Sequence, residues 1–382
     1  MGIPFNASPR SSLGIEMELE LVDVSSRELH SGASGLLEIM GKGHAGGEHP
    51  KAKHELFEST VEIITGVCTT VAEARHDLAA TLAELQELTD ARGLALMCSG
   101  THPFTHWDTQ RVSPNPRYHQ LVGEMQWLAR RLQIFGIHVH VGVRSAEKVI
   151  AIANGLVAYL PHLLALSASS PYWMGRDTGL ASSRSKVFES LPMAGLPHQL
   201  AGWPEFEQFM RTLQRSKAIT SIREVWWDIR PHPDFGTVEV RVCDGLPRLG
   251  EVAGVAALVQ CLVERMDSWL DQGASLEVPK AWIARENKWK AARYGMDAEI
   301  IVDEEGTLRP LRDELAELVE ALAPVGAGLG CADELANVHA MVEQGPSYAR
   351  QRSLVAAGRS LPDVVDALIE ELRTDLPVWG KR

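Results

Sequence analysis

The stretch Gly14-Ile15-Glu16-Met17-Glu18-Leu19-Glu20-Leu21 alternates aliphatic and acidic residues with a period of two. Successive side chains of a β-strand point to opposite faces, so the pattern predicts a strand with one apolar and one acidic face. We expect the apolar face to pack against helices and the carboxylates to line the open face of a sheet. A merely solvated face is the alternative, because alternating Glu is common on exposed strands.

Two later segments have the same alternation: Ile137-His138-Val139-His140-Val141-Gly142 and Thr237-Val238-Glu239-Val240-Arg241-Val242. The first places two imidazoles on one face, where they are either metal ligands or a hydrogen-bonded structural pair. The second places a Glu and an Arg on one face. Strands that offer Glu, His and Glu suit a hard cation such as Mg²⁺ better than zinc. Together the three segments predict a metal-dependent active site on the open sheet face.

A fourth segment, Trp226-Trp227-Asp228-Ile229-Arg230-Pro231, adds a carboxylate and a guanidinium. Guanidinium groups bind phosphate or carboxylate through two parallel hydrogen bonds, so Arg230 is a candidate phosphate ligand. The alternative is a salt-bridge ladder that involves Asp228 and Arg230 on neighbouring strands. We expect the two tryptophans to pack in the core.

The composition excludes several classes of protein. Of the 382 residues 45% are hydrophobic and 23% are charged, which is ordinary for a soluble globular protein. A net charge of −13 disfavours nucleic-acid binding. Five scattered cysteines without C-x-x-C spacing predict neither a disulfide framework nor a thiolate zinc site, and they favour the cytoplasm. We find no apolar run of the roughly 20 residues that would cross a membrane.

Known nucleotide and hydrolase motifs are also absent. The sequence contains neither a P-loop nor a G-x-G-x-x-G fingerprint after a strand, and it has no G-x-S-x-G elbow. A nucleotide bound here would therefore use another kind of site. Residues 286–295 contain three cations, which we interpret as a solvated helix.

Periodicity predicts an α+β protein around one mainly antiparallel sheet, with a helix-rich part from about residue 310. Residues 25–50 are polar and rich in glycine, and we expect a mobile loop that is either a lid or disordered. Strands are expected near 12–24, 56–65, 94–99, 136–143, 225–230 and 236–243. Helices are expected at 71–92, 117–134, 146–167, 250–272, 311–323, 332–343 and 361–374.

Taken together, these segments resemble the type 2 glutamate–cysteine ligase family, also called carboxylate–amine ligases. Where many members read Glu-Glu-Glu, this chain has Met at position 17, on the aliphatic face. The resemblance extends almost from end to end of the chain. It rests on residues 14–23 (GIEMELELVD), 59–62 (STVE), 99–104 (SGTHPF), 136–142 (GIHVHVG), 191–195 (LPMAG), 226–231 (WWDIRP), 237–242 (TVEVRV) and 286–289 (ENKW).

The resemblance implies a single carboxylate–amine ligase catalytic domain over residues 1–382. Its fold would be glutamine-synthetase-like, a curved, mainly antiparallel sheet that is backed by helices and holds ATP and Mg²⁺. The implied reaction joins a glutamate-like carboxylic acid to a cysteine-like amine through an acyl phosphate. The sequence does not identify either substrate, and a homodimer is a default expectation. A metal-dependent amidase or hydrolase and a non-catalytic ATP-binding protein are the alternatives.

Resemblance and strand geometry together assign roles to individual residues. The loop at 32–47 would close over the site and exclude water. The expected metal ligands are Glu16, Glu18, Glu62, His140 and Glu239, with Glu55 as a weaker candidate. Arg241 and Arg230 are expected to act in catalysis and to hold ATP phosphates, together with Asp228 as a catalytic residue and Lys288 as an ATP ligand. Arg184 and His138 are expected to bind substrate.

Overall fold

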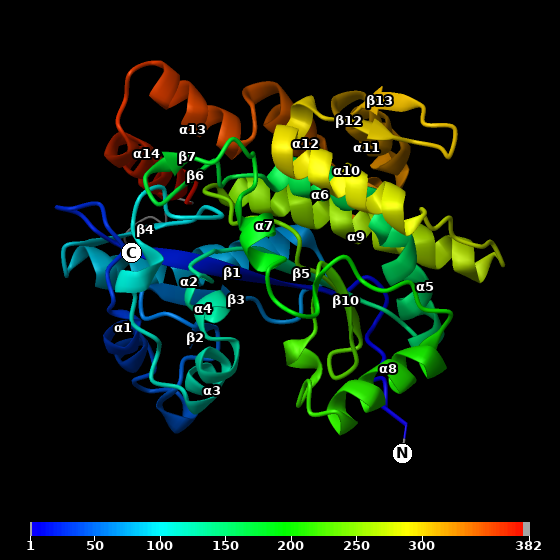
Figure 1. Cartoon of the computed structure of the whole chain (residues 1–382), viewed down its shortest axis with the longest axis horizontal. Coiled ribbons are helices and arrows are strands. Elements are labelled where there is room, and N and C mark those ends of the chain that lie inside the picture. Colours follow the sequence, from blue (N-terminus) through cyan, green and yellow to red (C-terminus); the bar gives the residue numbers. More distant parts are fainter. Residues whose placement is uncertain (1, 377–382) are drawn as a thin grey trace.

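A seven-stranded sheet contains the three alternating segments quoted above, in its strands β1, β5 and β11 (Figure 1). The structure, a computed structural model, describes residues 2–376. The strand order is β10-β11-β5-β1-β3-β2, and β4 also pairs with β1. Every pairing in this sheet is antiparallel, so the predicted α+β class is confirmed. The strands are β1 (Leu13–Asp23), β2 (Ala52–His54), β3 (Thr60–Ile64), β4 (Leu94–Met97), β5 (Ile137–Gly142), β10 (Ile229–His232) and β11 (Thr237–Val240).

Helices are present in every predicted range, but the range 117–134 is divided at Gln126, whose φ of 50° interrupts the helix, and its second part ends at Arg130. The range 146–167 is likewise divided by a short 3₁₀ turn. The helices are α1 (Ala33–Met40), α2 (Val71–Asp90), α3 (Pro116–Met125), α4 (Trp127–Arg130), α5 (Ala146–Leu156), α6 (Leu160–Ser167), α7 (Arg184–Phe188), α8 (Trp203–Arg215), α9 (Leu249–Asp271), α10 (Ala281–Tyr294), α11 (Leu311–Leu329), α12 (Ala332–Gln344), α13 (Ser347–Ala356) and α14 (Leu361–Thr374). The short strands are β6 (Tyr172–Trp173), β7 (Arg176–Asp177), β8 (Ala194–Gly195), β9 (Trp226–Trp227), β12 (Glu299–Ile301) and β13 (Leu308–Pro310).

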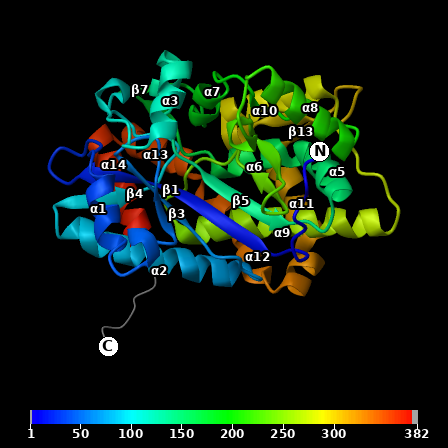
Figure 2. The same cartoon turned by 90° about the horizontal axis from the view of Figure 1, so that it is seen from below.

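The aliphatic face of the sheet is the main core. Ile15, Met17 and Leu19 on β1 are at most 1% exposed and belong to one large apolar cluster with residues of α2 and α9. Figure 2 shows these two helices along one side of the strands, with α3 and α7 on the other. A capping box between Thr70 and Glu73 starts α2 at the sheet edge. The helices thus cover one face and leave the ionisable face open.

Replacing Met17 with Leu should be nearly neutral. The side chain is fully buried between sheet and helices, on the face opposite to the carboxylates. Exchanges of similar volume in a core usually cost less than about 1.5 kcal/mol. We expect unchanged activity of the protein and a small shift in the urea midpoint. A large loss of activity with an unchanged midpoint would contradict the strand register.

The expectation of a mobile loop at 25–50 is wrong for its central part. Residues 33–40 form α1, which buries Ala33, Leu36, Leu37 and Met40. Four apolar side chains at helical spacing outweigh the flanking glycines, because together they cover the core. Residues 41–50 consist of turns and a short 3₁₀ helix, and most of them are exposed.

The expectation that no segment is long and apolar enough to cross a membrane also fails. Residues 146–167 run through α5 and α6 as 22 residues that pass this test by length and composition. However, 78% of the apolar window is buried inside the protein. These helices pack against α9 and the sheet, so the apolar run belongs to the core.

The predicted helix-rich part after residue 310 consists of α11 to α14. Leu315 and Leu322 of α11 and Val338 of α12 join the same apolar cluster as the sheet. The α14 side chains Val364 and Leu368 belong to a second cluster, which includes Val22 of β1. The C-terminal helices are therefore packed against the elements that carry the site.

Candidate active site

The open face of the sheet brings the predicted residues together in register. Glu16 of β1 lies opposite His138 of β5, and Glu18 lies opposite Glu62 of β3. Further along the sheet, Glu239 of β11 faces two residues, which are His140 of β5 and Arg230 of β10. Residues from five strands thus form one ionisable surface, as the alternation of the sequence predicted.

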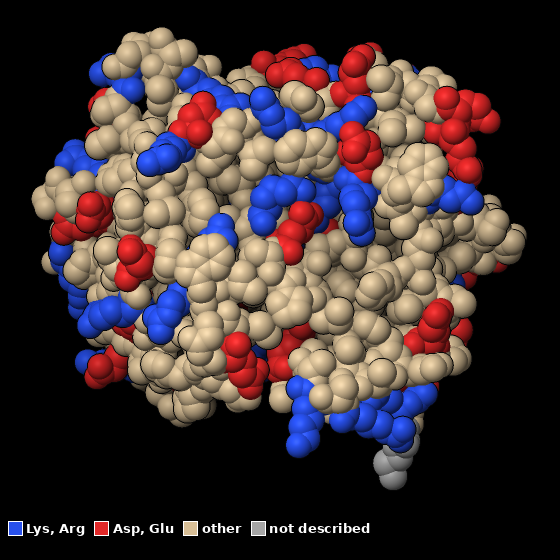
Figure 3. Space-filling view, in the orientation of Figure 1, with Lys and Arg blue, Asp and Glu red and all other residues tan. Residues whose placement is uncertain are grey.

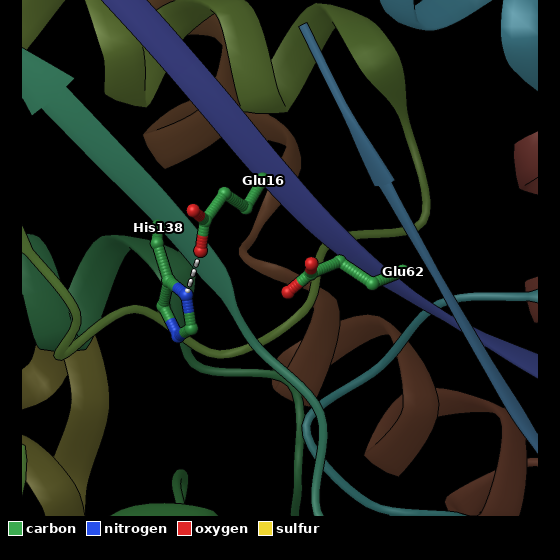
Figure 4. A group of neighbouring side chains, drawn as sticks. All are labelled: Glu16, Glu62 and His138. Atoms are coloured by element: carbon green, nitrogen blue, oxygen red, sulfur yellow. Dashed lines mark hydrogen bonds and ion pairs between the residues drawn. The ribbon is translucent and has the colours of Figure 1, made fainter. Parts of the chain in front are cut away.

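Glu16 is the centre of this surface. Its Oε2 lies 2.8 Å from His138 Nδ1, and its Oε1 lies 3.3 Å from His140 Nε2. Figure 4 shows the Glu16–His138 contact, with the Glu62 carboxylate directed toward the pair from β3. Burial raises the pKa of Glu16, but the two neighbouring imidazoles outweigh that effect and hold the pKa well below its usual value. Glu16 is therefore ionised and available to a cation.

Three groups of side chains have donor atoms that lie within 4.8 Å of one another. Glu16 belongs to two of these groups and Glu62 to two, so the groups adjoin. A chain of adjoining donor groups suits several cations bound side by side. The groups are Glu16–Glu62–His138, Glu16–His140–Glu239 and Glu18–Glu55–Glu62.

The third group is a cluster of like charges. Within residues 2–376, Lys and Arg form no ion pair with Glu18, Glu55 or Glu62. Burial, followed by the charge of Glu55, raises the pKa of Glu18 to about 8. Burial and neighbouring carboxylates also raise the pKa of Glu62 well above its ordinary value. Because a bound cation would relieve this repulsion, the residues fit a metal ion.

His140 is oriented like a metal ligand. Its Nδ1 lies 3.0 Å from the Thr237 hydroxyl, which fixes the ring. Its Nε2 lies between Glu16 Oε1 (3.3 Å) and Glu239 Oε1 (3.8 Å) but makes no well-formed hydrogen bond within the described residues. Metal-binding histidines commonly have their second nitrogen held in this way. Sequence reasoning missed Thr237, although it shares a strand face with Glu239.

The three predicted arginines differ in how many of their donors are free. Arg230 donates to Glu239 Oε2 at 2.7 and 2.9 Å and to two backbone carbonyls at 3.0 Å, so most of its donors are engaged. Arg241 pairs with the other oxygen of Glu239. The Nε atoms of Arg241 and Arg184 are buried without a hydrogen-bond partner in the described residues. Unpartnered buried donors are costly, and because Arg184 and Arg241 line a cavity, a bound anion there would satisfy their donors.

A cavity of about 1160 Å³ lies over this face. Its walls include Arg184, Arg241 and the 3₁₀ segment that ends at Gly47, as well as all the metal-ligand candidates named above. In the orientation of Figure 1, Lys and Arg side chains gather near the middle of the surface beside Asp and Glu (Figure 3). Positively and negatively charged side chains lie side by side on this face, and they do not form the continuous basic stripe that is typical of nucleic-acid binding.

Two predicted site residues do not line this cavity. Lys288 is 2% exposed, and its Nζ lies 2.5 Å from Asp228 Oδ2 and 2.5 Å from Glu189 Oε1. The proposed Asp228–Arg230 ladder is therefore replaced by two separate pairs, Asp228–Lys288 and Arg230–Glu239. The interpretation of 286–295 as a solvated helix is also wrong at Lys288, because its face of α10 is apolar. Trp226 and Trp227 are buried, as expected.

The model of glutamate–cysteine ligase family 2 matches residues 12–366. The chain belongs to this family. The resemblance inferred from the motifs is thereby confirmed, and the protein is an enzyme of the ligase class rather than the amidase considered above.

Two relatives of similar length match this chain almost from end to end. A Frankia casuarinae protein provisionally named glutamate–cysteine ligase 2-1 is 59% identical over 379 residues, 99% of both chains. A Thermobifida fusca protein provisionally named glutamate–cysteine ligase 2 is 52% identical over 380 residues, which cover 100% of this chain and 95% of its own. The family member therefore spans nearly the full length of such relatives.

Solved structures share the fold at low sequence identity. The glutamate–cysteine ligase of Francisella tularensis in complex with AMP superposes with a TM-score of 0.70 at 13% identity, over 98% of this chain and 91% of its own. A bifunctional glutathione synthetase from Pasteurella multocida gives 0.68 at 13% identity, over 96% of this chain and 53% of its own. The predicted fold class is confirmed.

Proposed function

We propose that this ligase uses Mg²⁺ and ATP to join the carboxylate of an amino acid to an amine. The observation that carries the proposal is that adjoining carboxylate and histidine groups line one cavity together with Arg184 and Arg241, whose Nε atoms have no hydrogen-bond partner in the described residues. Bound Mg²⁺ would neutralise the phosphate charge that develops during transfer. The names of the relatives suggest glutamate and cysteine as substrates.

Different residues of the cavity would bind the cations, the phosphates of ATP and the carboxylate of the substrate. Glu16, Glu62 and Glu18 would hold the cations together with His140 and Glu239. Arg241 is the stronger candidate for a phosphate contact, since the donors of Arg230 are mostly used within the protein. Arg184 would bind the carboxylate of the substrate.

The reaction would proceed in two displacements. An oxygen of the acid attacks the γ-phosphorus of ATP, and ADP leaves with the bridging oxygen. The amine nitrogen then attacks the acyl carbon and loses a proton to solvent. The bond between that carbon and the phosphate oxygen breaks, and phosphate leaves with the electron pair of this bond. Residues 47–49 line the cavity, and their contact with bound reactants would keep water from the acyl phosphate.

We also propose that the protein is cytoplasmic and forms a homodimer. All five cysteines are free and buried, which fits the predicted cytoplasm. A homodimer remains the default expectation.

Phosphate release from Mg²⁺–ATP tests the function. A matrix of amino acids and amines, with glutamate and cysteine included, would show release only when an acid and an amine are both present. Release with water alone at the same rate would contradict a ligase. The pair that gives the highest kcat/KM would name the substrates.

Binding of Mg²⁺ to the metal-free protein should release protons at about pH 7, since metal ligands bind as carboxylates. The folded-state pKa of Glu18 is about 8, against an ordinary value of 4.5, so this group carries a proton at neutral pH. An indicator dye in weak buffer would measure the release. The variant Glu18→Gln should release fewer protons, and equal release would remove Glu18 from the site.

The same raised pKa predicts how metal-free stability depends on pH. Because the folded state holds the Glu18 proton more tightly than the unfolded state, this contribution to stability is present at low pH and is lost as pH rises through 8. Added Mg²⁺ should therefore raise Tm more at about pH 9 than at about pH 7.

A further inference from the structure

Lys288 lies behind the cavity rather than inside it. Its ammonium is buried between the carboxylates of Asp228 and Glu189, at 2.5 Å from each. A lysine is buried only where its charge is compensated, and here two carboxylates compensate it. Lys288 does not line the cavity, so ATP in that cavity would not touch it.

Asp228 connects this ammonium to the backbone of Arg241. The Asp228 carbonyl accepts a hydrogen bond from the Arg241 amide at 2.8 Å, and the Asp228 amide donates to the Gly195 carbonyl at 2.8 Å. Asp228 lies between β9, which pairs with β8, and β10, which pairs with β11. Its backbone therefore links Gly195 of β8 to Arg241, the residue directly beyond the end of β11.

Glu189 connects the same ammonium to Arg184. It directly follows α7, the short helix that begins at Arg184, and its amide donates to the Ser185 carbonyl at 3.1 Å. A helix of five residues has little stability of its own, so contacts at its end help to fix it. Lys186 also pairs with Glu189, at 2.9 Å.

The two arginines meet directly. Both terminal nitrogens of Arg184 lie 3.4 Å from the Arg241 carbonyl, at the limit of a hydrogen bond. Both side chains line the cavity, and both have a buried Nε without a partner in the described residues. Their relative placement decides whether the reactants meet both guanidinium groups at once.

We propose that Lys288 is a positioning residue, whose ammonium holds the Arg184 segment and the Arg241 segment at the spacing that the bound reactants require. This inference rests on the proposed function, in which the two guanidinium groups contact phosphate and carboxylate. A purely neutralising role, in which Lys288 only compensates two buried carboxylates, is the competing explanation.

Lys288→Met, compared with Lys290→Met, tests the proposal. Lys290 is half-buried on the same helix and makes no ion pair within residues 2–376, so it is a matched control. Misplacement of a binding group by about 1 Å can cost about 100-fold, and we expect a loss of about that size in kcat/KM for Lys288→Met. Lys290→Met should retain wild-type kinetics.

Two double variants separate positioning from neutralisation. In Lys288→Met/Asp228→Asn the unpaired carboxylate is gone, so Tm should recover while kcat/KM stays low. Recovery of both would overturn the proposal. In an Arg241→Met background, Lys288→Met should cost much less than in the wild type, because part of its effect acts through Arg241. If the loss of kcat/KM in the double variant is the product of the two single losses, Lys288 acts independently of Arg241, which would contradict the proposal.

Amide hydrogen exchange measures how firmly the two arginine segments are held, and it does not require turnover. Peptides that cover residues 184–190 and 237–243 should exchange faster in Lys288→Met than in Lys290→Met. Unchanged exchange in both peptides would overturn the inference. If the wild type releases no phosphate with any acid and amine, the proposed function fails, and the exchange experiment still decides the role of Lys288.

Discussion

Glu16→Gln should lower kcat/KM for ATP-dependent ligation by about 1000-fold, the equivalent of about 4 kcal/mol. Glu16 contributes to two of the three donor groups, and it is the carboxylate that both His138 and His140 contact. Gln has the same size but no charge, so two cation positions would weaken together. The Mg²⁺ concentration for half-maximal activity should rise, which a metal titration under saturating ATP would measure.

Glu20→Gln is the matched control for this variant. Glu20 lies on the same face of the same strand, but it does not line the cavity and belongs to none of the donor groups. Its Oε1 accepts hydrogen bonds from the Ser99 amide (3.1 Å) and hydroxyl (2.9 Å). Burial raises its pKa well above the ordinary value, which favours the neutral acid, and Gln is similar to that acid in size and charge.

The two variants should therefore separate by about three orders of magnitude in kcat/KM. Equal losses of kcat/KM in the two variants would mean that the substitutions act by destabilising the fold. Melting curves of both variants would then show a lower Tm. Full activity in Glu16→Gln would remove Glu16 from the metal site and with it the centre of the proposed arrangement.

Alternation made the sheet and most of the site predictable. A period of two fixes which residues of one strand share a face, so placing Glu16 beside Glu18 and His138 beside His140 needed no tertiary information. Which strands are neighbours is a different question, because register between strands far apart in sequence depends on packing. Family resemblance predicted Glu62 as a metal ligand without its register, and the structure places Glu62 opposite Glu18.

Lys288 shows where sequence reasoning failed although a signal was present. Three cations within residues 286–295 suggested a solvated surface. Yet Ala284, Ala291 and Ala292 recur at steps of three and four residues around Lys288, and all are buried. This helical period assigns Lys288 to the inner face. Its partners Asp228 and Glu189 come from distant segments, and no local pattern identifies them.

The prediction of a mobile loop was wrong at residues 33–40 for a different reason. Glycines on both sides suggested mobility, whereas the apolar spacing of Leu36, Leu37 and Met40 was given too little weight. Composition over a long window conceals a helix of only eight residues, because most of the window is polar. Whether the remaining turn at 41–50 closes over substrates depends on ligands rather than on local sequence.

Arg241→Met should lower kcat by about 10²- to 10³-fold, the usual cost of removing one charge-stabilising donor from an active site. Arg241 lines the cavity, and its Nε is buried without a partner in the described residues. Glu239 would remain paired with Arg230, at 2.7 Å, so no carboxylate is left alone and the fold should survive. The exposed Arg215→Met on α8 is the control for the substitution.

The metal dependence of Arg241→Met separates a phosphate contact from a metal-site defect. Burial raises the pKa of Glu18 and of Glu55, and the positive charge of Arg241 partly opposes that rise, so removal of this charge makes the two groups more attractive to cations. The Mg²⁺ concentration for half-maximal activity should therefore stay the same or fall while kcat drops. A rise in that Mg²⁺ concentration would mean that Arg241 helps to form the metal site instead. An unchanged kcat would mean that Arg241 does not contact the phosphate.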